Sequence, residues 1–262
     1  MRNRSMARSL GLSLTAAVAL ASCVSVGSPV SRIANVDYPA PDGTTLKAYL
    51  VLLEGPGPFP GVVMIHEWWG LDEETREKAD RLSRRGFAVL AIDAYRGKSA
   101  DSVPGAIMLV STTPRDRIAA DVDAGWSYLA GLPRVDPQRM GAVGFCFGGT
   151  QTMLLGVRNA RLKAAVIFYG SGPITDPAKL GHLGVGGPVL GIFGDKDSNI
   201  PTRDALAFGA AMKAKGISSE LTVYPGQGHA FVKAGSIDAP GASRDAWNQM
   251  VDFLVSALGR AG

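Results

Sequence analysis

The segment Gly144-Phe145-Cys146-Phe147-Gly148-Gly149 constrains the fold of this 262-residue chain more than any other feature. An apolar run over 140–145 predicts a buried strand, and residues 150–155 predict a helix. Glycines beside the cysteine let strand and helix approach closely and permit a strained, sharp turn. Such a turn would expose Cys146 as a nucleophile and aim the N–H of Phe147 at a developing oxyanion. The alternative is a purely packing role, because a lone cysteine often behaves as a small buried hydrophobe.

Residues 1–22 have the composition of an export signal. Three arginines precede an apolar stretch over 10–21, which is too short to span a bilayer. The stretch ends in Leu20-Ala21-Ser22-Cys23, which resembles a bacterial lipobox. Lipidation of Cys23 would tether the protein to a membrane surface, so we expect an exported lipoprotein on the periplasmic side of a membrane or at the cell surface. An ordinary cleavage site or an uncleaved start remains the alternative.

The remaining chain has room for one large domain. We expect a tether over 23–32 and a single α/β domain over 33–262 that is monomeric. The net charge is +4, and it falls to about +1 without the three leader arginines. Because no basic stripe interleaved with aromatic residues occurs, nucleic acid is not an expected partner. With Cys23 lipidated, Cys146 would be the only thiol, which favours a functional role in an oxidising compartment.

Strand and helix patterns alternate along the chain. Strands are expected at 33–38, 45–53, 61–66, 87–93, 140–145, 162–170, 188–194 and 220–224, and helices at 72–86, 115–132, 150–155, 202–216 and 242–258. Segments 54–60 and 94–106 are predicted as loops, and charges spaced four apart on 72–86, such as Glu74 and Lys78, as a solvated face. The alternation predicts a mostly parallel, doubly wound sheet with helices on both faces, with ligands at the carboxyl ends of the strands.

A thiolate nucleophile needs a base, and the base needs a group that orients it. The chain has three histidines, and His229 follows the last predicted strand within Gly228-His229-Ala230-Phe231. This position favours His229 as the base, although a loop histidine can also cap or pack. His66 ends a strand and is interpreted as structural, and His182 is expected to be exposed.

Two acids compete for the orienting role. Asp195 and Asp197 both follow the strand over 188–194, so nucleophile, acid and histidine occur in the order typical of hydrolases of this topology. The spacing Gly-x-x-Asp, with a proline (Pro201) four residues later, selects Asp197. Asp195 is then expected to cap the turn or to meet solvent.

The segment His66-Glu67-Trp68-Trp69-Gly70 follows the third predicted strand. Glu67 is either a surface acid or a partner that keeps the Cys146 thiol neutral until substrate arrives, which would also slow oxidation. Trp68 would supply the second oxyanion N–H. Trp69 is expected either to line the wall of the pocket or only to pack against neighbouring side chains.

Taken together, these motifs resemble the dienelactone hydrolase family over about 33–258. The resemblance rests on Glu67-x-x-Gly70, Asp93-Ala94-Tyr95, Gly144-Phe145-Cys146-Phe147-Gly148-Gly149, Asp197-x-x-x-Pro201 and Gly228-His229-x-Phe231. It implies an α/β-hydrolase fold and a Cys146–His229–Asp197 triad gated by Glu67. It also implies hydrolysis of a small lactone or ester without a cofactor or a metal ion.

The chain departs from the family at two substrate-binding positions. Family members hold the substrate carboxylate with two arginines, and Lys233 occupies the place of one. The other is expected around 102–109, where this chain has no Arg or Lys, so Arg96 or Lys98 is a candidate substitute. Lysine cannot form the bidentate pair that arginine forms, which argues against dienelactone itself as the natural substrate.

The sequence therefore predicts a carboxymethylenebutenolidase-like hydrolase that cleaves a lactone or carboxylic ester through an acyl-enzyme on Cys146. One alternative is a general carboxylesterase or thioesterase that uses the same residues. Another is a catalytically silent, lipid-anchored binding protein of the same fold.

Overall fold

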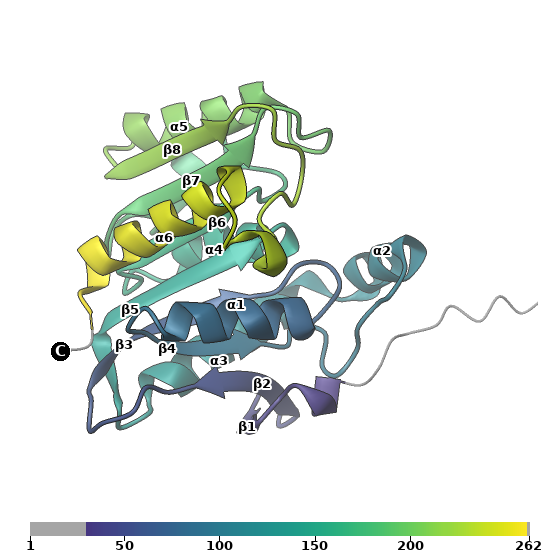
Figure 1. The fold of residues 1–262 in the computed structure, drawn as a ribbon, viewed down its shortest axis with the longest axis vertical. Helices are drawn as coiled ribbons and strands as arrows, with labels where there is room; N and C mark the ends of the chain where they lie inside the picture. Colours follow the sequence, from purple (N-terminus) through teal and green to yellow (C-terminus); the bar gives the residue numbers. More distant parts are fainter. Residues whose placement is uncertain (1–29, 261–262) are drawn as a thin grey trace, which may run out of the picture.

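The computed structural model describes residues 30–260, which form one eight-stranded sheet in the order β1-β2-β4-β3-β5-β6-β7-β8 (Figure 1). The pairs β1–β2 and β2–β4 are antiparallel, and the pairings from β4 across to β8 are parallel. The strands are β1 Val36–Pro39, β2 Thr45–Val51, β3 Phe59–Ile65, β4 Ala88–Ile92, β5 Val135–Phe145, β6 Ala164–Phe168, β7 Val189–Gly194 and β8 Ser219–Tyr224. The predicted mostly parallel sheet is confirmed.

Helices cover both faces of this sheet. The α-helices are α1 Glu73–Ser83, α2 Val103–Thr112, α3 Arg115–Ala130, α4 Phe147–Arg158, α5 Thr202–Ala214 and α6 Ala242–Leu258. Short 3₁₀ turns, η1 Val30–Arg32, η2 Pro177–Leu180 and η3 Ala234–Ser236, complete the described elements. Figure 1 shows α1 and α6 on the near face and α3 and α4 behind the sheet, as right-handed crossovers between parallel strands require.

Burial explains the nearly continuous apolar strands. Every residue of β3, β4, β6 and β7 is buried, because helices pack on both faces of the central sheet. Parallel strands bring their carboxyl ends to one edge, so the loops after β3, β5, β7 and β8 meet there. This is the edge at which the arrowheads of the parallel strands lie in Figure 1.

The predicted loop over 54–60 is two residues too long. Phe59 and Pro60 begin β3 and pair with the first residues of β5, and the register shifts between Pro60 and Gly61. The irregularity accommodates a proline, which has no N–H to donate to a ladder. The N–H of Phe59 donates to the carbonyl of Arg134 at 2.8 Å and fixes the start of the strand.

Helix α2 was not predicted from the sequence. Its Pro104 lies in the first turn, where a helix needs no N–H donor, so the Pro-Gly pair did not prevent the helix. Most of its side chains are apolar and none is charged, so no amphipathic stripe marked it. Val103 and Ile107 are 51% and 53% exposed. The helix projects beyond the carboxyl ends of the strands (Figure 1).

The described fold begins within the segment predicted as a tether, 23–32, because η1 carries Val30, whose side chain is buried against the core. The leader over 1–22 and the predicted lipidation site Cys23 lie outside the described residues. Across 30–260, none of the helices combines the length and the apolar composition that crossing a bilayer requires.

Candidate active site

Cys146 occupies a strained turn between β5 and α4. Its backbone has φ 55° and ψ −113°, a left-handed conformation that non-glycine residues rarely adopt. Its N–H donates to the carbonyl of Phe168 at 3.0 Å, and its carbonyl accepts the N–H of Thr150 at 3.2 Å. These bonds hold the turn to the end of β6 and to the first turn of α4, so the strain is maintained by the surrounding sheet.

The glycines around Cys146 are required by close backbone approach. A Cβ on Gly148 would overlap the carbonyl oxygen of Ile65 and lie 2.7 Å from that of His66. A Cβ on Gly149 would overlap the carbonyl oxygen of Phe168. The turn can therefore sit against the ends of β3 and β6 only with glycine at these positions.

His229 and Asp197 come together at the same edge of the sheet. The Nδ1 atom of His229 lies 2.7 Å from Oδ2 of the buried Asp197 carboxylate. Oδ1 of Asp197 accepts the backbone N–H groups of Asn199 at 2.8 Å and Ile200 at 3.1 Å. These donors fix the carboxylate, and its contact with Nδ1 orients the ring so that Nε2 is left to exchange protons.

Asp195 has a different partner. Its Oδ1 atom accepts the backbone N–H of Gly226 at 2.6 Å, which ties the loop after β7 to the turn after β8. The structure thus brings Asp197, and not Asp195, to the imidazole.

The Cys146 thiol is held in its neutral form. Burial and the charge of Glu67 raise the pKa of Cys146 to about 11. The backbone N–H groups of Phe147 and Trp68 point at the sulfur and oppose this increase only in part. Among residues 30–260, the hydrogen bonds do not include one between this thiol and His229. The sulfur therefore lies with the predicted oxyanion donors rather than with the predicted base.

Glu67 is buried between two lysines. Its carboxylate oxygens lie 3.3 and 3.2 Å from Nζ of Lys233, and Oε1 lies 3.5 Å from Nζ of Lys78. Lys78 is 1% exposed, so the predicted solvated face of α1 was wrong at this residue. Its spacing from Glu74 matched an ordinary surface pair, and only the fold shows that Glu67 faces the same point.

His66 has a structural role in this arrangement. Its Nε2 atom accepts the N–H of Ala94 at 3.1 Å, and its Nδ1 lies 2.5 Å from the carbonyl oxygen of Glu67. Burial lowers the pKa of His66, which keeps the ring neutral. The imidazole thereby fixes the backbone of the loop that carries Glu67. His182, in the loop between η2 and β7, is exposed, as expected.

Two cavities meet at Cys146, Trp68 and Ser171. The smaller has a volume of about 430 Å³ and is also lined by Glu67, Trp69, Asn199, His229, Ala230 and Lys233. The larger has a volume of about 810 Å³ and lies between α2, α3 and α4. A substrate bound at the thiol can therefore extend in two directions.

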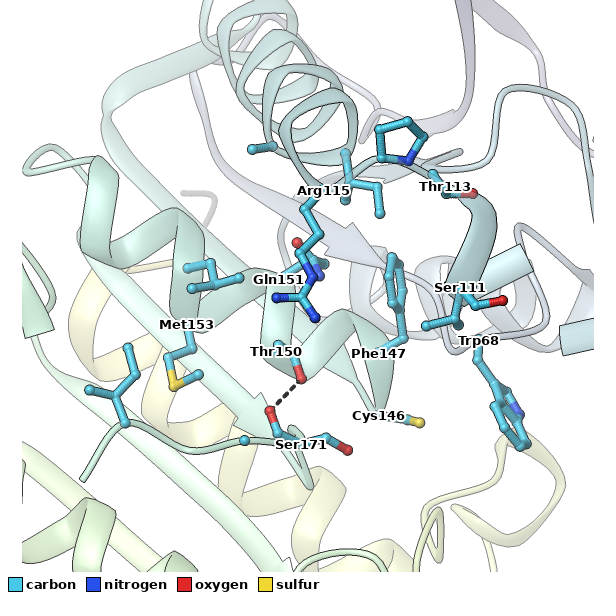
Figure 2. Close-up of a pocket in the computed structure, with 17 residues that line it drawn as sticks. Trp68, Ser111, Thr113, Arg115, Cys146, Phe147, Thr150, Gln151, Met153 and Ser171 are labelled. Carbon is cyan, nitrogen blue, oxygen red and sulfur yellow. Dashed lines mark hydrogen bonds between the residues drawn. The ribbon is translucent and has the colours of Figure 1, made fainter. Parts of the chain in front are cut away.

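The larger cavity is mostly apolar but contains one charged side chain among its lining residues, that of Arg115. Figure 2 shows Arg115 reaching from the start of α3 into the cavity, toward Thr150 and Gln151, with the Cys146 sulfur at its edge. Arg115 belongs to no motif in the sequence, so only the fold could place it here.

Arg96 does not reach the site that the sequence analysis assigned to it. Its guanidinium lies 2.6 and 2.7 Å from the oxygens of the buried Asp121 carboxylate and 2.8 Å from Asp42. It lines neither cavity at Cys146. The substrate-binding role expected for Arg96 is therefore corrected to a structural one, in which it links the hairpin of β1 and β2 to α3.

Tyr169 was also missed by the sequence analysis. It follows β6, with a φ of 36°, and its ring centroid lies 5.3 Å from that of His229 and 5.7 Å from that of Phe231. Burial raises the pKa of Tyr169, so its hydroxyl stays protonated.

The order of the strands, the strained cysteine and the His–Asp pair define an α/β-hydrolase. The profile of the Dienelactone hydrolase family matches residues 46–258. The protein usf of Aquifex pyrophilus is 31% identical over 226 residues, covering 83% of this chain and 96% of the relative. A Methylorubrum extorquens protein named as a carboxymethylenebutenolidase is 30% identical over 213 residues, covering 75% and 71%.

Solved structures agree with this result. A Klebsiella pneumoniae structure described as a dienelactone hydrolase superposes with a TM-score of 0.71 at 28% identity, covering 84% of this chain and 97% of the other. A dienelactone hydrolase-like promiscuous phosphotriesterase from metagenomic libraries gives 0.74 at 26% identity, covering 86% and 98%. The chain belongs to the dienelactone hydrolase family, and it is a hydrolase of the lactone and ester class.

The pKa of Cys146 makes a direct prediction. Without substrate, alkylation of Cys146 by iodoacetamide should be slow at pH 7 and rise about tenfold per pH unit up to pH 10, because only the thiolate reacts. In Glu67→Gln the curve should move to lower pH, because the charge that raises the pKa is gone. Intact-mass measurement of the modification rate tests both statements. The exposed Glu54→Gln is the matched control, and a plateau below pH 8 in the unmodified protein would contradict them.

Proposed function

We propose that the protein hydrolyses a carboxylic ester or lactone through a Cys146–His229–Asp197 triad and a thioester acyl-enzyme. The observation that carries the proposal is the strained Cys146 turn at the sheet edge where the His229–Asp197 pair also lies. A left-handed cysteine costs about 1–3 kcal/mol and is expected where it presents a nucleophile. The identity of the family supports the same reaction class.

The resting thiol must leave its present position to react. An entering carbonyl oxygen would take the N–H groups of Phe147 and Trp68, which now point at the sulfur. The displaced sulfur would turn toward His229, whose Nε2 accepts the thiol proton. This sequence keeps the thiol protonated until a substrate occupies the oxyanion donors, so oxidation of the free enzyme is slow.

The acylation step follows from this geometry. The Cys146 thiolate attacks the carbonyl carbon, and the N–H groups of Phe147 and Trp68 stabilise the oxyanion, each by about 3–4 kcal/mol. The C–O bond of the ester then breaks, and the imidazolium of His229 gives its proton to the departing alkoxide. In a lactone the alcohol formed stays attached to the acyl group.

Deacylation uses the same groups. Nε2 of His229 takes a proton from water, which attacks the thioester carbonyl and expels the Cys146 thiolate. The proton held by His229 returns to the sulfur, and the carboxylic acid leaves. Asp197 stabilises the imidazolium in both steps through its contact with Nδ1.

Substrate contacts are assigned to the two cavities. The side chain of Lys233 is 46% exposed and faces the smaller cavity with Trp69, so it can turn from Glu67 toward a polar group of the substrate. Arg115 can meet an anionic group in the larger cavity. A general carboxylesterase or a thioesterase would use the same residues, and a silent binding protein would leave Cys146 unacylated.

The two neighbouring aspartates provide a matched test of the triad. Asp197→Asn should lower kcat for an aryl ester about 10²–10⁴-fold, because the ring loses its orienting carboxylate and the stabilisation of its cation. Asp195→Asn should leave kcat close to that of the unmodified protein, since its carboxylate only holds a turn. Steady-state kinetics with both variants checks this. Equal losses in the two variants would remove Asp197 from the triad.

The position of Arg115 in the larger cavity predicts a preference for anionic substrates. Arg115→Gln should raise KM for a carboxylated lactone about tenfold, because one charge-assisted hydrogen bond is lost, and leave KM for its neutral methyl ester unchanged. The exposed Arg161→Gln serves as the control. A variant that changes both KM values by the same factor would show that Arg115 does not select for charge.

We further propose that Cys23, outside the described residues, carries a lipid that holds the enzyme at a membrane surface on the exported side. In protein isolated from the native host, Cys23 should carry a diacylglyceryl group, and Cys23→Ser should lack it with its esterase activity retained. Mass spectrometry of the N-terminal peptide measures this, and an unmodified Cys23 would refute the anchor.

A further inference from the structure

Lys78 is a buried ammonium beside the site. Its side chain is 2% exposed, and it lies on α1, none of whose residues lines either cavity at Cys146. Burying a lysine costs several kcal/mol unless opposite charges and hydrogen-bond acceptors surround it. Its partners therefore indicate what its charge stabilises.

Two of the three partners of Lys78, Glu67 and Phe145, lie next to the thiol. Its Nζ atom lies 3.0 Å from Oε1 of Glu74 and 3.5 Å from Oε1 of Glu67. The same atom lies 4.2 Å from the centroid of the Phe145 ring, and Phe145 is the residue before Cys146. The ammonium thus contacts both the strand that carries Cys146 and the carboxylate that raises the thiol pKa.

The second cation on Glu67 differs from the first in exposure. Lys233 has a side chain that is 46% exposed, and it lines the smaller cavity, whereas Lys78 is enclosed. The loop that carries Lys233 is itself tied to α1, because the N–H of Ala234 donates to Oε1 of Glu74 at 2.8 Å. Lys233 can therefore turn to a substrate while its backbone remains fixed, and Lys78 cannot leave.

We propose that Lys78 is a positioning residue, the permanent counter-ion that keeps the Glu67 carboxylate beside Cys146 when Lys233 turns to the substrate. The proposal deepens the proposed function and rests on it for the catalytic consequence. Without this ammonium the buried Glu67 carboxylate would take up a proton or turn away, so the negative charge that raises the thiol pKa would be lost.

A double-mutant cycle that measures the alkylation rate of Cys146 tests the proposed role of Lys78 and requires no substrate turnover. In Lys78→Met, iodoacetamide modification of Cys146 at pH 8 should speed up about three- to tenfold, which corresponds to a fall of half to one unit in the thiol pKa. In the Glu67→Gln background the same substitution should change the rate by less than about twofold, because the group through which Lys78 acts has lost its charge. Lys47→Met, which breaks an exposed ion pair with Asp37, is the control.

Each outcome decides the proposal. Equal factors in both backgrounds, or no change in either, would overturn it, because Lys78 would then act independently of Glu67 or not at all. If Lys78→Met does not fold, as judged by thermal unfolding, Lys78→Gln takes its place in the cycle, and Lys78→Arg should restore the alkylation rate. Coupling in the cycle without hydrolysis of any ester would uphold the role of Lys78 at the thiol and reject the proposed function.

Discussion

The site depends on how closely three backbones approach one another behind Cys146. Gly148 lies against the carbonyl groups at the end of β3, and Gly149 against that of Phe168 at the end of β6. No larger residue fits there, so the chain must turn sharply and Cys146 takes its left-handed conformation. The same approach brings the loop after β3, with Glu67 and Trp68, to the sulfur. The residues proposed as nucleophile, oxyanion donors and gating acid are therefore placed by one steric constraint.

Charge balance determines the resting state of this arrangement. A buried carboxylate beside a thiol raises the thiol pKa, and Glu67 remains buried because two lysines compensate it. One of them is enclosed by α1 and the other faces the cavity. A substrate can recruit the exposed lysine and occupy the oxyanion donors at the same time. Under the proposed mechanism, the enzyme keeps an oxidisable cysteine neutral until a substrate is bound.

Local patterns predicted the features whose signal lies within a few residues. The elbow glycines, the alternation of strands and helices, and the bounds of α6 all follow from such patterns, and the spacing to Pro201 selected Asp197 over Asp195. The misses depend on contacts across the fold. Lys78 has the spacing of a surface residue, and Arg96 forms an ion pair with Asp121 on α3. Arg115 lines a cavity that is also lined by α2, a helix that was not predicted. Side-chain partners distant in sequence cannot be read from periodicity.

The central claim is that the reaction passes through a thioester on Cys146. The most direct measurement mixes the protein lacking residues 1–23 with an aryl ester, quenches it in acid within milliseconds and maps the adduct by peptide mass spectrometry. We expect an acyl group on the peptide that contains Cys146, formed at the rate of the product burst and absent in Cys146→Ala. Hydrolysis that continues in Cys146→Ala, or an acyl group on another residue, would contradict it.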